Sequence, residues 1–158
     1  MTVTPTPAAA PLAPGQGAHH RMVDGDHVAK ALVEDACGAF EVFEVVAEPG
    51  PPAPPHVSPW SGVLFVLEGT VRVHVEDARH DMSPGATITL PAGTSCTVEV
   101  PDGAPSRFLA VTSGTGAGRF FADFARSVAL DRPLAETLPE VLAVTRRHGV
   151  VVSGAPQP

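Results

Sequence analysis

The feature that most constrains the fold is a series of short apolar segments, rich in valine and other β-branched residues, that recur roughly every ten residues over 38–112. Turns rich in proline and glycine, such as EPGPPAPP, SPG, PAG and PDGAP, separate these segments. Proline has no N–H to donate to a β-ladder, so each turn ends a strand. The pattern is typical of an all-β sandwich or barrel. The six segments are residues 39–47, 62–69, 70–77, 86–91, 95–100 and 106–112, and residues 27–35 are a candidate for an additional edge strand.

The segment TVRVHVED, residues 70–77, shows how the strands should be oriented. Its three valines alternate with polar residues, and successive side chains of a strand point to opposite faces. One face is therefore buried and the other is polar. His74 lies on the polar face, so we expect a solvent-facing or interface residue there and not a metal ligand.

The pattern changes to a helical period after Ser113. Residues 116–130 place Phe120, Phe121 and Phe124 on one face of a predicted helix. A second predicted helix, residues 138–149, carries a proline in its first turn, basic residues in its last turn and a glycine as its stop. We expect two C-terminal helices whose aromatic stripe packs on the barrel. The tail that follows is expected either to add a strand or to lie along the surface.

These segments predict one domain in three parts, since 158 residues suffice for one hydrophobic core. A flexible Pro/Ala-rich arm spans residues 1–20, a β-barrel spans 21–113, and a helical extension spans 114–158 and packs on the barrel. Within the arm we expect His19 and His20 to be solvated.

The charge pattern excludes several partners. The formal net charge is −7 and the ten Lys and Arg residues are scattered, so no basic surface is predicted for nucleic acid. No segment approaches the roughly 18 consecutive apolar residues of a membrane span, and the N-terminus does not resemble a secretion signal. We therefore expect a cytoplasmic protein without nucleic-acid or membrane partners, in which Cys37 and Cys96 are free thiols.

Two stretches, PPHVSPWSGVLFVLEGTVRVHV and SPGATITLPAGTSCTVEV, resemble the two conserved motifs of the cupin superfamily in the right order and separation. Gly69 matches the closing glycine of the first motif, and Gly85, Pro91 and Gly93 fit the second. The remainder is similar to the C-terminal extension of small bacterial cupins often labelled quercetin-dioxygenase-like. The resemblance implies an all-β cupin fold, a double-stranded β-helix or jelly-roll barrel, with two C-terminal α-helices.

The metal-binding motif of that family is degraded in this chain. In the family, two histidines two residues apart, a glutamate and a third histidine hold a metal. Those positions are His56, Ser58, Gly62 and Cys96 here, and Val100 replaces the asparagine of the second motif. A catalytic zinc site needs three protein ligands. We expect no metal and no cofactor, with a residual metal-dependent dioxygenase or cyclase using His56 and Cys96 as an alternative.

Without a metal, the barrel mouth should remain an apolar pocket with a few polar groups, which is the usual form of a ligand site. Trp60, in a proline-stiffened loop, is expected either to form a wall for a flat or polyene substrate or to pack against its own barrel. Motif position and strand alternation predict the substrate-binding residues Ser58, Trp60, Leu64, Val66, Cys96, Val98 and Phe108.

Two titratable residues are candidates for catalysis. An imidazole without a metal titrates near neutral pH, so His56 is the candidate for proton transfer. Glu44 lies in a strand whose two faces are both mostly apolar, and burial there would raise its pKa into the range of a general acid.

These features predict a metal-independent cyclase or isomerase, including a pericyclic ring closure, that acts on a small apolar polyketide-like molecule in secondary metabolism. A non-catalytic ligand-binding cupin is a further alternative. We also expect a homodimer, formed through the polar outer face of residues 70–77 or through the C-terminal helices.

Overall fold

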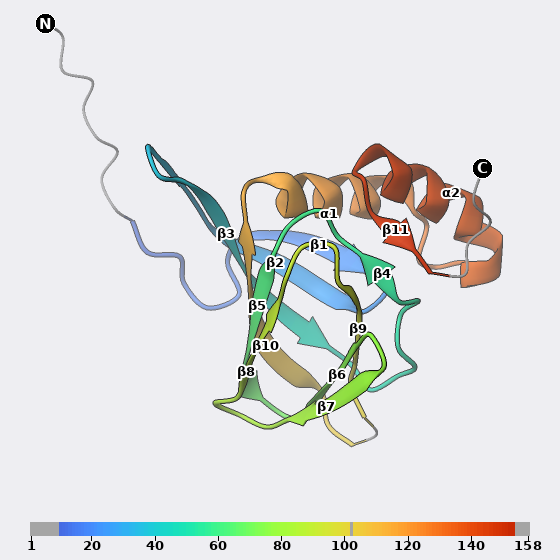
Figure 1. Cartoon of the computed structure of the whole chain (residues 1–158), viewed down its shortest axis with the longest axis horizontal. Helices are drawn as coiled ribbons and strands as arrows, with labels where there is room; N and C mark the ends of the chain where they lie inside the picture. The colour runs from blue at the N-terminus through green and yellow to red at the C-terminus, as the bar shows by residue number, and fades with distance from the viewer. Residues whose placement is uncertain (1–9, 102, 154–158) are drawn as a thin grey trace, which may run out of the picture.

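The computed structural model describes residues 10–101 and 103–153, which form two facing antiparallel β-sheets followed by two helices (Figure 1). This architecture confirms the predicted jelly-roll barrel. In spatial order, the first sheet contains β1 (Ala18–Met22), β2 (Gly25–Asp35), β3 (Gly38–Ala47), β10 (Ser106–Ser113), β5 (Gly62–Glu68) and β8 (Thr87–Leu90). The second contains β11 (Val151–Val152), β4 (His56–Val57), β9 (Ser95–Glu99), β6 (Val71–Val75) and β7 (Ala78–Met82). The helices are α1 (Gly116–Ser127) and α2 (Leu134–Arg147).

The N-terminal strand β1 is the main departure from the sequence prediction. Ala18, His19 and His20, which the sequence places in the flexible arm, pair with β2 instead, while residues 1–9 lie outside the described part. Val23 and Asp24 form a two-residue hairpin loop before Gly25. As a result β2 lies between β1 and β3 and is not an edge strand.

His19 lies on the outer face of the β1–β2 hairpin and is held there by a hydrogen bond, so it is not simply solvated. His19 Nδ1 lies 2.7 Å from Asp26 Oδ2. This hydrogen bond to a carboxylate raises the pKa of the His19 imidazole. The pair fastens β1 to β2 at a position that the sequence placed in a mobile arm.

The helices cover one end of the barrel, where α1 and α2 lie side by side (Figure 1). The second helix begins at Leu134, four residues before the predicted start, so Pro139 lies inside α2 and not in its first turn. The predicted apolar stripe is confirmed as packing, because Phe120 and Phe124 are buried with Val144 and Val150. The C-terminal tail adds β11, which pairs with β4 and joins the helical extension to the barrel.

The start of α1 is fastened to the barrel by a buried carboxylate. Glu41 points from β3 into the interior, and its Oε2 accepts a hydrogen bond of 2.9 Å from the Gly118 N–H. A carboxylate is favourable near a helix N-terminus because the first N–H groups of a helix lack partners. A Cβ atom at residue 118 would collide with the Glu41 carboxylate. Glycine at this position therefore lets the helix approach the sheet.

The two helices are joined by a cluster around Asp123. Its Oδ2 accepts hydrogen bonds from Arg147 at 3.0 Å and from His148 Nε2 at 2.9 Å, and its Oδ1 accepts one from Arg126 at 2.8 Å. The hydrogen bond from His148, with those from the arginines, holds the pKa of Asp123 well below its usual range. The cluster thus fixes α2 against α1, above the barrel mouth.

The Asp123→Asn variant is expected to lose about 1–3 kcal/mol of unfolding free energy at pH 7, because charge-assisted hydrogen bonds become neutral ones. A carboxylate whose folded pKa is depressed adds stability above its unfolded pKa of about 3.9, and this contribution disappears as pH falls through the lower folded value. Urea unfolding of both proteins should therefore show a difference at pH 7 that shrinks steadily below pH 4. A difference that stays constant down to pH 2 contradicts this assignment.

The outer surfaces of the two sheets differ in polarity. On β6, Arg72 and His74 point outward and are held by Glu99, at 3.3 and 3.0 Å, which confirms the predicted orientation of His74. The first sheet instead exposes apolar side chains on its outer face, among them Phe40 and Phe65. No helix in the described ranges is both long and apolar enough to cross a membrane.

Candidate functional site

Two adjoining cavities lie at the end of the barrel that the helices cover. We call the inner cavity the one inside the barrel, about 110 Å³ in volume, and the outer cavity the one between the barrel mouth, α1 and α2, about 90 Å³. Both are lined mostly by apolar side chains. Five residues line both of them and therefore mark the junction: Asp24, His27, His56, Phe120 and Phe121.

Most of the residues predicted to bind substrate, and the catalytic candidate His56, are brought together in the inner cavity. They come from β4 and the loop after it, from β5, from β9 and from β10. The predicted residues that line it are His56, Ser58, Trp60, Leu64, Cys96, Val98 and Phe108. Motif position therefore located this wall of the barrel well.

Val66 does not line the inner cavity. It points to the same side of β5 as Leu64, but it is completely buried in the same hydrophobic core as Phe43 and Val45. Strand alternation gives the face of a side chain and not its depth, so it could not separate Val66 from Leu64.

Glu44 lies outside the site. It points to the outer face of β3, between Lys30 Nζ at 3.7 Å and Arg107 Nη1 at 3.2 Å. The sequence was misleading because the outer face of β3 also carries exposed apolar residues, Phe40 and Val46. Both faces therefore looked buried, whereas the inward carboxylate on this strand is that of Glu41.

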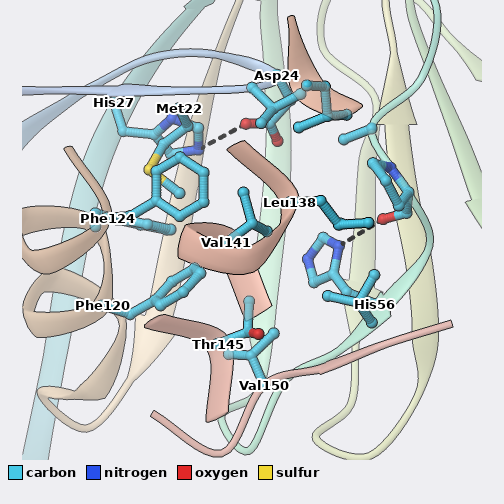
Figure 2. Close-up of a pocket in the computed structure, with 16 residues that line it drawn as sticks. Met22, Asp24, His27, His56, Phe120, Phe124, Leu138, Val141, Thr145 and Val150 are labelled. Carbon is cyan, nitrogen blue, oxygen red and sulfur yellow. Dashed lines mark hydrogen bonds and ion pairs between the residues drawn. The ribbon is translucent and has the colours of Figure 1, made fainter. Parts of the chain in front are cut away.

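His56 is held at the junction of the two cavities. It lies in β4, directly opposite Cys96 of β9. Its Nδ1 is 3.3 Å from the carbonyl oxygen of Pro54 (Figure 2). A carbonyl only accepts hydrogen bonds, so this contact favours the neutral tautomer with the proton on Nδ1 and a lone pair on Nε2. His56 is thereby suited to accept a proton at Nε2.

A second histidine at the junction, His27, was not among the site residues predicted from the sequence. It points inward from β2, opposite Val45, and is only 6% exposed. Its Nε2 is 3.9 Å from Asp24 Oδ1 (Figure 2), and its ring centroid is 4.5 Å from that of Phe121. The nearest signal was the DG dipeptide at residues 24–25, which is typical of a β-hairpin. In the structure the two-residue loop is Val23–Asp24, and the hairpin pairs residues 18–22 with 25–29.

Aromatic rings form the wall on the side of the helices. The ring centroids of Trp60 and Phe120 are 5.8 Å apart, and those of Phe120 and Phe121 are 5.7 Å apart. Trp60 therefore both lines the inner cavity and packs against the helical extension, so the two roles considered for it coexist. Figure 2 shows Leu138 and Val141 of α2 directed into the outer cavity.

Cys96 is a partly buried thiol in the wall of the inner cavity. Burial raises the pKa of the Cys96 thiol, and the carboxylates of Asp24 and Glu76 raise it further. The thiolate is the reactive form of cysteine. Cys96 is therefore expected to be unreactive, in contrast to Cys37, which is exposed.

Alkylation by iodoacetamide at pH 8 should modify Cys37 at least about tenfold faster than Cys96, because only Cys37 is freely accessible and the Cys96 thiol is largely protonated. Peptide mass spectrometry at several times gives both rates in the same sample, with Cys37 as the internal control. Equal rates would show that the inner cavity is more open, and the Cys96 thiol more acidic, than described.

Comparison with known proteins shows which family and which solved structures this barrel resembles. Residues 43–112 match the family model described as Cupin domain. No curated protein has a significant sequence match to the chain. The polyketide cyclase RemF from Streptomyces resistomycificus is structurally similar, with a TM-score of 0.58 and 21% identity over 68% of this chain and 81% of that one. KdgF from a Halomonas species has a TM-score of 0.58 and 16% identity over 67% of this chain and 95% of that one. An RmlC-like cupin from Shewanella frigidimarina has a TM-score of 0.57 and 14% identity over 68% of this chain and 93% of that one.

The fold and the cavities define a small jelly-roll barrel with an interior site at its covered end. With the match of residues 43–112 to the family model, this shows that the barrel is a cupin domain. The resemblance found in the sequence is thus confirmed at this level, although the narrower quercetin-dioxygenase-like label is not. At these identities the structural similarity concerns the fold alone.

Many cupins hold a metal in the barrel, but the donors present here do not fit one. Within residues 10–101 and 103–153, no group of three or more His, Cys, Asp or Glu side chains is arranged to bind a metal ion. Of the family's four ligand positions, Ser58 and Gly62 offer no charged or imidazole donor. Cys96 would bind a metal only as the thiolate, which burial of its side chain disfavours. His56 is the one imidazole donor left at those positions.

Proposed function

We propose that this protein is a metal-independent cyclase or isomerase that acts on a small apolar, polyketide-like molecule. The observation that carries the proposal is an imidazole, His56, positioned by a backbone carbonyl at the junction of two apolar cavities. The polyketide cyclase RemF shares the fold, and the suggested reaction class follows that similarity. The degraded ligand set favours chemistry by side chains of the chain itself.

The cavities would contribute mainly by holding a flexible substrate in a reactive shape. Correct orientation of reacting groups is worth up to roughly 7–11 kcal/mol of a barrier in well-ordered systems. Apolar walls also exclude water from an enolate or other reactive intermediate. The aromatic wall of Trp60, Phe120 and Phe121 suits a flat, conjugated molecule.

His56 would carry the proton transfer. In the neutral tautomer with the proton on Nδ1, its Nε2 can take a proton from a carbon next to a ketone, and it can return that proton to another carbon or to the oxygen. This step is common to aldol-type ring closure and to keto–enol isomerisation. A positioned general base typically contributes 10²–10⁴-fold to the rate of such a step.

The proposal can be tested with 2-tetralone, an apolar two-ring ketone whose protons next to the carbonyl exchange with D₂O. The wild-type protein is expected to accelerate this exchange, followed by NMR, well beyond an equal concentration of free imidazole. His56→Gln should reduce the acceleration by about 100-fold or more. His80→Gln, which changes an exposed histidine of β7, is the matched control and should leave it unchanged.

Exchange no faster than with free imidazole, although 2-tetralone binds, would contradict the catalytic proposal. That result would instead favour a cupin that binds its ligand and releases it unchanged.

A further inference from the structure

Three buried side-chain atoms make no hydrogen bond within the described residues: Asp26 Oδ1, His27 Nδ1 and Thr112 Oγ1. His27 and Thr112 both line the inner cavity, and each residue is only 6% exposed. A buried polar atom without a partner is costly, and native proteins keep few of them. Two such atoms in the wall of one cavity indicate polar contacts that a bound molecule would complete.

The chemistry of the His27 contact follows from its neighbour. The Asp24 carboxylate, 3.9 Å from Nε2, favours the proton of the neutral imidazole on Nε2. The buried Nδ1 is then a hydrogen-bond acceptor. It calls for an O–H donor, such as a phenol or an enol, and not for a carbonyl oxygen. Thr112 Oγ1 can donate or accept and therefore suits a hydroxyl or a carbonyl.

The two contacts are well separated along the sheet. Thr112 pairs with Glu41 of β3, while His27 pairs with Val45, four residues further along. At about 3.3 Å per residue, roughly 13 Å of strand lies between these positions. Thr112 lines only the inner cavity, whereas His27 also lines the outer one. A molecule that meets both atoms must therefore be elongated.

The volumes of the two cavities also indicate that the ligand extends beyond the inner cavity. A cavity on the order of 150 Å³ holds one benzene ring, so the inner cavity, at about 110 Å³, has no room for two. A larger molecule must continue past His27 into the outer cavity. There it meets Phe124, Leu138 and Val141, which are apolar.

We propose that the ligand is an elongated molecule, larger than a single ring, that spans both cavities. It is oxygenated at its inner end, beside Thr112, carries a phenolic or enolic hydroxyl beside His27, and ends in an apolar part under α2. This inference rests on the proposed function for the assumption that the cavities hold a substrate. It concerns how that molecule is recognised and not the chemical step. Asp24 acts as a positioning residue for His27.

The test compares two probes that differ in one O–H group, 2-naphthol and 2-methoxynaphthalene, by calorimetric titration. The wild-type protein is expected to bind 2-naphthol about 5–10-fold more tightly than the ether, the usual size of one hydrogen bond. His27→Phe, which keeps an aromatic ring against Phe121, should abolish this preference while the ether still binds.

Equal binding of both probes to the wild-type protein would overturn the inference and leave the proposed function standing. Conversely, a clear preference for 2-naphthol without exchange of 2-tetralone would support the inference while the catalytic proposal fails. A preference that persists in His27→Phe would also overturn the assignment to His27.

A stability measurement tests the second contact without any ligand. Replacing an unpartnered buried hydroxyl by a methyl group removes a desolvation cost, so Thr112→Val should raise the melting temperature by about 2–4 °C. Thr97→Val is the matched control, because Thr97 is equally buried but donates a hydrogen bond of 2.6 Å to the Ala53 carbonyl. That variant should melt lower than the wild type. A lower melting temperature for Thr112→Val as well would show that its hydroxyl is satisfied within the protein.

Discussion

The Phe120→Ala variant is expected to lose about 3–5 kcal/mol of unfolding free energy, the usual cost of removing a buried aromatic side chain. Phe120 is 6% exposed, and its ring contacts those of Trp60, Phe121, Phe124 and His148 at centroid distances of 5.7–5.9 Å. It therefore links the barrel mouth to both helices. Because it also lines both cavities, the loss should loosen the helical cover as well as the core.

Denaturant titration followed by circular dichroism measures this effect, and Phe40→Ala is the matched control. Phe40 is a phenylalanine of β3 that is 43% exposed on the outer face of the sheet, so its loss should cost less than about 1 kcal/mol. Equal effects of the two substitutions would mean that the helical extension is not packed on the barrel as described.

The Ala110→Phe variant is expected to lose binding of 2-naphthol by about 100-fold or more, a change of roughly 2.7 kcal/mol. Ala110 is buried in β10 and lines the inner cavity between Phe108 and Thr112. A cavity on the order of 150 Å³ holds one benzene ring, so a phenyl side chain fills the inner cavity of about 110 Å³. The new side chain should therefore exclude a ligand from the inner cavity.

The neighbouring substitution Leu109→Phe provides the control, because Leu109 points to the other face of β10 and does not line the inner cavity. It should leave binding within about twofold of wild type. Overpacking in Ala110→Phe costs about 1–3 kcal/mol of stability, so binding is compared at a temperature where both variants are folded. Undiminished binding to Ala110→Phe would place the ligand elsewhere.

The sequence was sufficient for the barrel because its strands carry their own signals. Alternating valines, as in residues 71–75, fix both the strand and its buried face, and the Pro/Gly turns mark where each strand ends. The signal failed at β1. There the polar pair His19 and His20 follows a segment rich in proline and alanine, and strand pairing with β2, a non-local interaction, overrides the local composition.

The candidate site was predicted only where a motif fixed the position. His56 and Cys96 were found because the family motif aligns them, and the structure places them opposite one another. His27 belongs to no motif, and its place in the site depends on a hairpin that had not been recognised. Thr112 could not have been singled out, because an unpartnered hydroxyl is a property of the folded chain and not of the sequence. The assignment of Glu44 to the site was wrong because an exposed apolar face of a strand cannot be distinguished from a buried one in the sequence.

The most direct test of the account is elemental analysis of the purified, tag-free protein by inductively coupled plasma mass spectrometry, after incubation with Fe, Mn, Ni and Zn salts and desalting. The account predicts metal far below one ion per chain and unchanged binding of 2-naphthol after treatment with a chelator. About one ion per chain, lost in a Cys96→Ala variant together with probe binding, would contradict it and assign His56 and Cys96 to a metal centre.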